Sequence, residues 1–305
     1  MAKTVLITGC SSGFGRSAAL QFRQEGWRVA ATMRDPSAWS DARSDALMVL
    51  PLDVESDASV DAAIDATLAH FGTLDCVVNN AGKATASVFE ATSIDAAKQI
   101  FETNVFGVMR VMQKVLPHFR AVGGGRFVNV GSASAISPDT LMSIYGASKW
   151  AAAGLAEGLR YELTQFGVDL KLVEPGFVGE TKFLQNTLDN GKATIVPDAY
   201  RDFFDAALRA FFEDTPFTFA TIEQVAQTIV AAATDDTGTF RFVVGEDARA
   251  SAFMRRSTSE DAYDGWAWLR HQQGAAAGAE RYRSLARAQA GLAQAAGSHK
   301  HSREV

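Results

Sequence analysis

The fold is decided by residues 3–15, KTVLITGCSSGFG, in which an apolar run leads directly into three glycines. After Lys3, its next five residues are all apolar or β-branched, which is typical of a strand buried on both faces. Gly9, Gly13 and Gly15 follow, and a helical pattern then continues to about Glu25. A strand, a glycine loop and a helix in this order form an anion site, because the glycines admit a pyrophosphate and the helix N-terminus supplies free N–H groups. We therefore expect a nucleotide site, although glycine loops also serve as plain turns.

Outward from this stretch, short apolar runs alternate with helical patterns along the chain. Strands are expected near residues 27–33, 47–52, 75–78, 126–130, 169–174 and 240–244, and helices near 57–71, 94–119, 143–166 and 222–234. This alternation predicts an α/β fold with a Rossmann-type doubly wound parallel sheet, whose ligands bind at the carboxyl ends of the strands. We assign residues 1–247 to this single domain and residues 248–305 to a helical C-terminal extension.

Composition narrows the class of protein. The 305 residues are 47% apolar and 21% charged, which are ordinary globular values. A net charge of −6 argues against nucleic acid or an anionic membrane as partner. Neither a membrane span nor a signal peptide is recognisable, and the histidines have no metal-ligand spacing. Cys10 and Cys76 fall in the glycine loop and an expected buried strand, so we predict reduced thiols and a cytoplasmic protein without metal.

The end of the second expected strand bears on cofactor choice. About 20 residues past the glycines, an acid binds the ribose 2′-OH of NAD, or an Arg accommodates the 2′-phosphate of NADP. Here no carboxylate stands at the strand tip and Arg34 follows it, while Ser11 and Ser12 add hydroxyl donors for a phosphate. We therefore favour NADP(H). Asp35 follows at once, however, and could instead pair with Arg34 or meet a ribose.

Polar residues follow the other expected strands. Asp53 could accept a hydrogen bond from an adenine amino group or serve as a turn aspartate. Residues 79–82, NNAG, can hold a turn that shapes one wall of the cofactor crevice. Asn104 is either an ordinary exposed residue or, with Gly107, the mark of a helix kink with a freed backbone group. Thr181 is a candidate for the nicotinamide carboxamide or the phosphates.

The expected helix at residues 143–166 carries a candidate acid–base pair. Tyr145 and Lys149 stand at positions i and i+4, so their side chains leave the same helix face. An ammonium beside a phenol stabilises the phenolate, and we expect Lys149 to lower the Tyr145 pKa towards a catalytic range. Taken alone, this spacing is more often a solvated surface pair. Ser132 lies shortly before, in the loop that follows the fifth strand.

Together these motifs resemble the single-domain branch of the short-chain dehydrogenase/reductase family, which are NAD(P)-dependent enzymes acting on alcohols and carbonyls. The resemblance covers about residues 3–245. It is carried by Thr8-Gly9-xxx-Gly13-x-Gly15, Asn79-Asn80-Ala81-Gly82, Asn104, Ser132, Tyr145-xxx-Lys149 and Pro175-Gly176. The stretch 31–35, ATMRD, is similar to hydroxysteroid and retinol dehydrogenase-like members, in which the Arg at the place of Arg34 meets the 2′-phosphate. Gly131 is a small departure, since many members carry Ser there.

The resemblance implies a role for each site residue. Ser132 and Tyr145 would donate hydrogen bonds to the substrate oxygen, and Tyr145 would exchange the proton. Lys149 would lower the Tyr145 pKa and hold the nicotinamide ribose, while Asn104 would fix a water that links Lys149 to solvent. The residues predicted to bind the cofactor are Gly9, Ser11, Ser12, Gly13, Phe14, Gly15, Arg34, Asp53, Val54, Asn80, Ala81, Gly82, Tyr145, Lys149, Pro175, Gly176, Val178 and Thr181.

Residues 183–220 are rich in Phe and form either plain core or a lid over an apolar substrate. We predict an NADP(H)-dependent oxidoreductase that interconverts an alcohol and a carbonyl compound, with a bulky apolar secondary alcohol and its ketone as the expected pair. The alternatives are a nucleotide-binding regulator that has lost the chemistry, or a reductase of a C=C or imine bond. Ala147, Ala151, Gly154 and Gly158 permit close approach of another helix, and the resemblance implies a homodimer or homotetramer.

Overall fold

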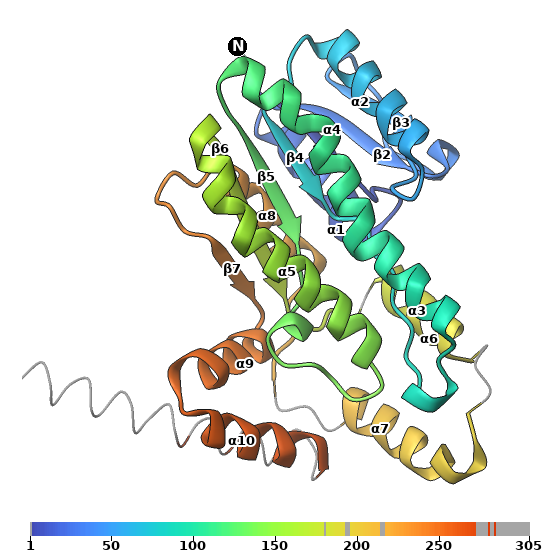
Figure 1. Cartoon of the computed structure of the whole chain (residues 1–305). Helices are drawn as coiled ribbons and strands as arrows, with labels where there is room; N and C mark the ends of the chain where they lie inside the picture. The colour runs from blue at the N-terminus through green and yellow to red at the C-terminus, as the bar shows by residue number, and fades with distance from the viewer. Residues whose placement is uncertain are drawn as a thin grey trace, which may run out of the picture.

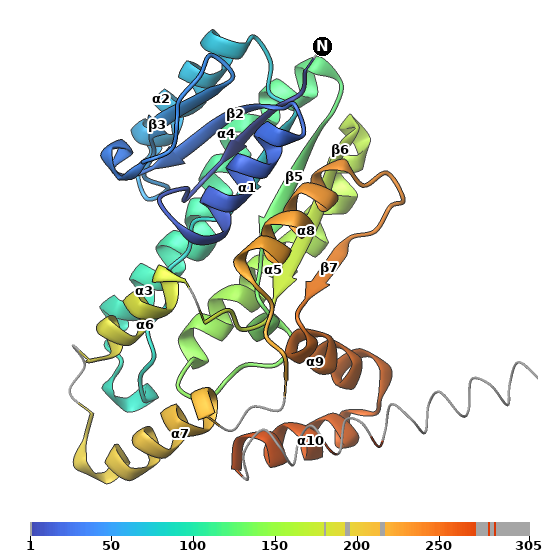
Figure 2. The same cartoon turned by 180° about the vertical axis from the view of Figure 1, so that it is seen from behind.

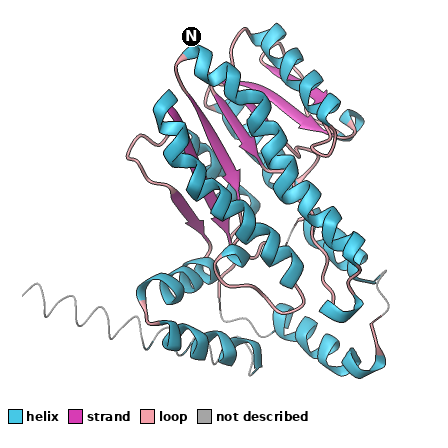
Figure 3. Ribbon diagram, viewed as in Figure 1, coloured by secondary structure: helices cyan, strands magenta, loops and turns pink. Residues whose placement is uncertain are grey.

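The computed structural model describes residues 2–179, 181–192, 196–213 and 217–272, together with residues 280 and 284. Within them, parallel strands form one seven-stranded sheet in the order β3-β2-β1-β4-β5-β6-β7 (Figures 1 and 3). The strands are β1 (Thr4–Ile7), β2 (Arg28–Met33), β3 (Leu47–Pro51), β4 (Cys76–Asn79), β5 (Gly125–Val130), β6 (Val168–Pro175) and β7 (Arg241–Val244). The predicted doubly wound sheet is confirmed.

The strand order opens a crevice beside β1. The chain first builds β2 and β3 on one side of β1 and then returns to place β4 to β7 on the other. Ile7 at the end of β1 accordingly pairs with Ala31 of β2 and with Val78 of β4. Because the connections leave β1 and β4 in opposite directions, the carboxyl ends of these two strands form the switch point at which ligands bind.

Helices cover both faces of the sheet. Helices α1 (Gly13–Gln24) and α8 (Ile222–Thr234) lie on one face, as the rear view shows (Figure 2). Helices α2 (Asp57–Phe71), α4 (Gly107–Val122) and α5 (Ser143–Leu163) lie on the other (Figure 1). Each layer buries its own apolar cluster against the strands, which is why the strands read as continuous apolar runs rather than alternating ones.

The long helix expected from residue 94 is interrupted near the predicted position. It consists of α3 (Ile94–Phe101), a π-helical turn at Glu102–Phe106 and then α4. The π turn contains Asn104, and of the two alternatives for this residue the structure shows the change in the helix and not an ordinary exposed position. Such a turn removes a normal i→i−4 bond, so a local change in the helix is confirmed.

The carboxyl end of the sheet is covered by four further helices. These are α6 (Lys182–Lys192), α7 (Arg201–Glu213), α9 (Glu246–Ser257) and α10 (Glu260–Gln272). Figure 3 shows them beyond the strand arrowheads, where ligands are expected. Of the expected helical C-terminal extension, the part after residue 272 lies outside the described residues except for residues 280 and 284.

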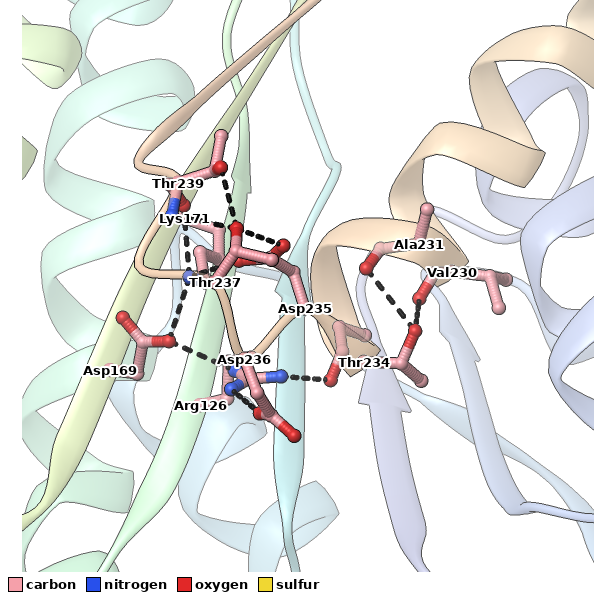
Figure 4. Close-up of polar contacts among 11 residues, drawn as sticks. Arg126, Asp169, Lys171, Val230, Ala231, Thr234, Asp235, Asp236, Thr237 and Thr239 are labelled. Carbon is pink, nitrogen blue, oxygen red and sulfur yellow. Dashed lines mark hydrogen bonds and ion pairs between the residues drawn. The ribbon is translucent and has the colours of Figure 1, made fainter.

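An ionic cluster stabilises the opposite end of the sheet (Figure 4). Lys171 on β6 is only 1% exposed, and its Nζ lies 2.9 Å from Asp235 and 3.0 Å from Asp169. Arg126 on β5 also contacts Asp169, at 3.2 Å, and reaches Asp236 at 2.9 Å. Hydrogen bonds from Thr237 and Lys171 lower the Asp235 pKa to about 2. These pairs hold the loop between α8 and β7 against the sheet.

Other features of the described residues concern the class of protein. Cys10 and Cys76 are both buried and unpaired, which confirms the prediction of free thiols. In the part of the chain that the structure describes, no helix combines the length and apolarity needed to cross a membrane. Nor do three His, Cys, Asp or Glu side chains of that part gather as metal ligands would.

Candidate active site

The glycine loop between β1 and α1 is held by the turn that follows β4. Asn80 Nδ2 donates to the carbonyls of Thr8 and Gly9, at 2.9 and 3.0 Å. Thr8 Oγ1 in turn accepts from the backbone N–H groups of Asn80 and Ala81, both at 3.0 Å. A Cβ built on Gly9 would lie 2.9 Å from Ala81 Cα, and one on Gly15 only 2.5 Å from the Gly9 carbonyl oxygen. Only glycines fit this contact, and the turn at residues 79–82 supports the loop.

A groove runs from this loop across the carboxyl ends of β1 to β4. The predicted cofactor residues that line it are Gly9, Ser11, Ser12, Gly13, Phe14, Arg34, Asp53, Val54, Asn80, Ala81, Gly82, Tyr145, Lys149 and Thr181. Gly15 is buried beneath the loop, in contact with its backbone. Pro175, Gly176 and Val178 line a neighbouring pocket and not this groove. The structure thus brings most of the predicted set together, and it separates the residues after β6 from the rest.

The N-terminus of α1 faces this groove with its first turn uncapped. Ser12 is the N-cap residue, and its side chain makes no capping hydrogen bond. The hydroxyl and the first N–H groups of the helix therefore stay available to an anion, and the helix dipole favours one there. With the close glycine cradle, these groups fit a pyrophosphate.

The side chains of Arg34 and Asp35 make different contacts at the edge of the groove. Asp35 begins a 3₁₀ turn, where its carboxylate accepts from the backbone and the hydroxyl of Ser37, both at 2.9 Å. These bonds lower the pKa of Asp35. Within the described part of the chain, Arg34 makes no ion pair with Asp35 or any other residue, and it lines the groove. The alternative in which Arg34 forms an ion pair with Asp35 is therefore not found in the structure.

Two charged groove residues were missed by the sequence reasoning. Glu55 accepts from Lys83 Nζ at 2.6 Å and also from the Thr103 hydroxyl. Burial raises the pKa of Glu55, but these bonds and the charge of Arg34 outweigh it and lower the pKa overall. Lys83 follows the NNAG turn directly, and Glu55 comes two residues after Asp53. Proximity to recognised motifs was the signal that could have found them.

The catalytic candidates meet where the groove ends. Tyr145 and Lys149 are both buried on α5, with Lys149 Nζ 5.8 Å from the centroid of the Tyr145 ring. The Tyr145 hydroxyl is hydrogen-bonded to Ser132. Lys149 Nζ donates to the Val130 carbonyl at 2.9 Å. The structure brings these groups together, and the pair is not a solvated surface pair.

The predicted electrostatic effect of Lys149 on Tyr145 is not found. Burial raises the pKa of Tyr145 to about 12, although the hydrogen bond with Ser132 lowers it in part. Burial also lowers the pKa of Lys149 to about 8. Removal of both groups from water favours their neutral forms, and the Lys149 ammonium is turned to the Val130 carbonyl. Desolvation therefore outweighs the stabilisation of phenolate that the spacing suggested.

The side chain of Asn104 in the π turn is only 1% exposed, and it hydrogen-bonds both to the segment after β4 and to α5. Its Nδ2 donates to the Lys83 carbonyl and to Ser148 Oγ, both at 2.9 Å, and its Oδ1 accepts from Lys83 N at 2.8 Å. A Cβ built on Gly82 would lie 3.5 Å from Asn104 Oδ1 and 3.8 Å from Lys149 Nζ. The side-chain amide of Asn104 thus forms its hydrogen bonds with other protein groups. A water near Lys149 would have to hydrogen-bond to the backbone of the π turn.

A second pocket adjoins the groove at Tyr145. Both are lined by Phe14, Thr181 and Phe183, and Phe183 packs on the Tyr145 ring with centroids 5.7 Å apart. The Phe-rich insert supplies Phe183, Leu188, Leu208, Phe217 and Phe219 to the pocket wall. These described residues of the insert thus line the pocket, and the closure of the insert over a substrate stays a prediction.

Comparison with known proteins agrees with this geometry. The family described as short chain dehydrogenase matches residues 3–191. The chain belongs to this family. This short-chain dehydrogenase is 35% identical to retinol dehydrogenase 8 of Bos taurus over 228 residues, which are 70% of this chain and 72% of the relative. It is therefore an NAD(P)-dependent oxidoreductase that acts on CH–OH and C=O groups.

Solved structures share the fold. One from Streptomyces avermitilis superimposes with a TM-score of 0.74 at 28% identity, over 88% of this chain and 97% of that one. ElxO with NADP bound superimposes with a TM-score of 0.66 at 27% identity, over 80% of this chain and 97% of that one. The resemblance inferred from the motifs is confirmed.

Proposed function

We propose that this short-chain dehydrogenase uses NADP(H) to interconvert a bulky apolar secondary alcohol and its ketone. The observation that carries the proposal is the junction at Tyr145, where the glycine-lined groove meets the Phe-lined pocket. A hydride can pass only between groups held face to face, and this junction provides one place for a cofactor and one for a substrate. Ser132, Tyr145 and Lys149 are the proposed catalytic residues, and Asn104 is a positioning residue.

The groove residues fit a dinucleotide. The pyrophosphate would lie on the glycine loop (Gly9, Gly13 and Gly15) at the uncapped N-terminus of α1. The Asp53 carboxylate would accept a hydrogen bond from the adenine amino group. Arg34 and the hydroxyls of Ser11 and Ser12 would hold a 2′-phosphate. When bound, the nicotinamide supplies or accepts the hydride. Binding, orientation and proton transfer are the work of the protein's own residues.

Tyr145 and Ser132 would act on the substrate oxygen. During reduction this oxygen gains negative charge, and donors aimed at it lower the barrier. Tyr145 keeps its proton at neutral pH because burial raises its pKa to about 12, so it can give that proton to the oxygen. The protonated Lys149 would hold the nicotinamide ribose and would stabilise the charge that Tyr145 acquires.

The pH dependence follows from Lys149. Its pKa is lowered to about 8, so the ammonium is present below that pH and is lost as the pH rises through it. We expect kcat/KM for ketone reduction to fall as the pH rises above about 8, because this parameter reports the free enzyme. Rates measured from pH 6 to 10, with Lys149→Met for comparison, test this. A profile that rises across this range would contradict the assignment.

Arg34 is expected to select NADPH. Removing a charge-assisted contact worth about 1.5–3 kcal/mol should reduce the ratio of kcat/KM for NADPH over NADH at least about 10-fold in Arg34→Ala. Arg43→Ala is the matched control, since Arg43 is exposed in the same loop region and does not line the groove. An unchanged ratio in Arg34→Ala, or a wild-type preference for NADH, would overturn the NADP(H) proposal.

The reaction class is tested with a panel of ketones, aldehydes, enones and imines, followed by NADPH oxidation and product identification. Ketone reduction to the secondary alcohol supports the proposal. Selective saturation of enones, or turnover of imines alone, would assign the enzyme to the other reductase classes. Binding of NADPH without turnover of any member would favour a regulator.

We also propose a cytoplasmic homodimer or homotetramer. Ala147, Ala151, Gly154 and Gly158 form an exposed stripe on α5, and nothing lies within 4 Å of a Cβ built on either glycine. Such a stripe allows two helices to approach closely. Light scattering on the eluted full-length protein determines its mass, and a monomer at micromolar concentration would refute this assembly.

A further inference from the structure

One loop joins the two residues that are proposed to act on the substrate oxygen. It runs from Ser132, after β5, to Tyr145 on α5, and its residues 133–135 form a 3₁₀ turn. Leu141 in this loop has a φ of 64°, which lies in the left-handed region. A residue with a Cβ adopts this conformation only where surrounding contacts hold it there. The position of Ser132 relative to Tyr145 therefore depends on the contacts that restrain the loop.

Ser134 in this loop orients the hydroxyl of Ser132. The backbone N–H of Ser134 donates to Ser132 Oγ at 3.1 Å. A serine hydroxyl has one proton to donate and two lone pairs to accept with, and this bond occupies one lone pair. The Ser132 proton is therefore directed away from Ser134 and toward Tyr145, to which Ser132 is hydrogen-bonded. The Ser134 amide thus makes Ser132 a donor at the place where the substrate oxygen would lie.

An ion pair fixes Ser134 in turn. Its hydroxyl donates to Asp139 Oδ2 at 3.3 Å, and Oδ1 of the same carboxylate accepts from Arg270 Nη2 at 2.8 Å. The side chains of Asp139 and Arg270 are each only 16% exposed, so salt and water screen their attraction little. Arg270 Nη1 also donates to Ser251 Oγ of α9, at 3.3 Å. The cation that holds Asp139 is thus itself anchored to a second helix.

Helix α10 holds the loop at a second point. His271, which follows Arg270 on the helix, places its Nδ1 2.9 Å from Oγ1 of Thr140, which follows Asp139 in the loop. Two successive residues of α10 therefore contact two successive residues of the loop. The next loop residue is Leu141, whose left-handed backbone requires such support.

We propose that Arg270 on α10 is a positioning residue for the reaction, and that it acts on the Ser132 hydroxyl through the chain of hydrogen bonds just described. Arg270 holds the Asp139 carboxylate, the carboxylate holds the Ser134 side chain, and the Ser134 amide orients Ser132. This inference rests on the proposed function, and it makes the C-terminal extension necessary for full turnover.

Rates of ketone reduction by the full-length enzyme with NADPH test this role. Arg270→Met removes the cation and keeps a long side chain. It is expected to lower kcat about 10-fold, because a small displacement of a catalytic group is costly, and to change KM less than about threefold. Arg270→Lys keeps the positive charge and should recover at least about a third of the wild-type kcat. A loss confined to KM would make Arg270 a substrate contact and would overturn the proposal.

Arg255→Met is the matched control for a general loosening of α10. Arg255 joins α9 to α10 through an ion pair with Glu260 at 3.1 Å, and it is not part of the pocket wall. Its kcat is expected to stay within about twofold of the wild type. If this variant lost as much turnover as Arg270→Met, the specific role of Arg270 would be refuted.

A double-mutant cycle identifies the path. Asp139→Ala should lower kcat about 10-fold, and adding Arg270→Met should lower it less than about twofold further, because both act through one carboxylate. Losses that multiply would contradict this path. The Asp139 charge also raises the pKa of Tyr145. Ser134→Ala leaves both charges in place, and it should lower kcat severalfold if the hydrogen bonds carry the effect. A wild-type rate in Ser134→Ala would assign the effect to the charge alone and refute the proposal.

Hydrogen exchange separates this inference from the proposed function, because it needs no turnover. The amides of Ser134, Ile136 and Met142 are hydrogen-bonded within the loop. Their exchange is expected to be at least about 10-fold faster in Arg270→Met and unchanged in Arg255→Met. If no ketone is reduced but exchange rises in this way, the proposed reaction fails and the restraint of the loop by Arg270 stands. If ketones are reduced, and both kcat and exchange in Arg270→Met match the wild type, the inference is refuted.

Discussion

Tyr145→Phe is expected to lower kcat by at least about 100-fold while NADPH still binds, because it removes only the proposed acid–base group. The Tyr145 ring is buried and packs on Phe183, so phenylalanine should keep the shape of the junction between groove and pocket. The lost atom is the hydroxyl that is hydrogen-bonded to Ser132. The defect should therefore appear in turnover and not in cofactor affinity.

Steady-state rates and NADPH fluorescence titration measure these two quantities separately. Tyr161→Phe is the matched control, because Tyr161 lies on the same helix α5 but is 69% exposed. Turnover in Tyr145→Phe that stays near the wild-type rate would remove Tyr145 from the mechanism. A simultaneous loss of NADPH binding would instead indicate a structural defect.

Gly15→Ala is expected to weaken NADPH binding strongly. Its Cβ would lie 2.5 Å from both the Gly9 carbonyl oxygen and Asn80 Nδ2, well inside van der Waals contact. The glycine loop and the turn after β4 must then move apart, which breaks the bonds that Asn80 makes to the loop. Displacing a ligand-binding loop by about 1 Å typically costs on the order of 100-fold, and we expect a loss of NADPH affinity of this size.

Isothermal calorimetry with NADPH checks this result, and circular dichroism checks that the variant is folded. Gly265→Ala is the control, since Gly265 lies within α10 with nothing inside 4 Å of a built Cβ. An alanine there should be neutral or stabilising by up to about 1 kcal/mol. If Gly15→Ala bound NADPH as tightly as the wild type, the contact between loop and turn would not define the cofactor site.

Much of this fold was predictable because neighbouring residues in the sequence determine where many of its helices and strands begin and end. Helix α8 has the predicted bounds, Ile222–Thr234, since Thr221 and Gln224 form a capping box at its start. Ser56 caps α2, because its side chain accepts a hydrogen bond from Ser59 N. In both cases neighbouring residues carry the signal. For Asn104 the sequence left a helix kink and an ordinary exposed residue both open, and the structure shows a π turn there.

The parts that could not be predicted depend on contacts between distant segments. Arg270 belongs to no motif, and it reaches the pocket only because α10 folds back to Asp139. The spacing of Tyr145 and Lys149 indicated proximity but not burial, which reversed the expected effect on the Tyr145 pKa. Gly176 was grouped with the cofactor residues by its motif, yet it lies in the pocket wall.

The wall shared by the groove and the pocket has a kinetic consequence. Phe14, Thr181 and Phe183 border both spaces, so a molecule seated in the groove completes one side of the pocket. A ketone that binds first would enter a pocket that lacks this side, whereas a ketone that binds after the dinucleotide would contact the complete pocket wall. We therefore expect an ordered addition, with the dinucleotide first on and last off. Release of the oxidised dinucleotide, and not hydride transfer, would then set the pace of the cycle for good substrates.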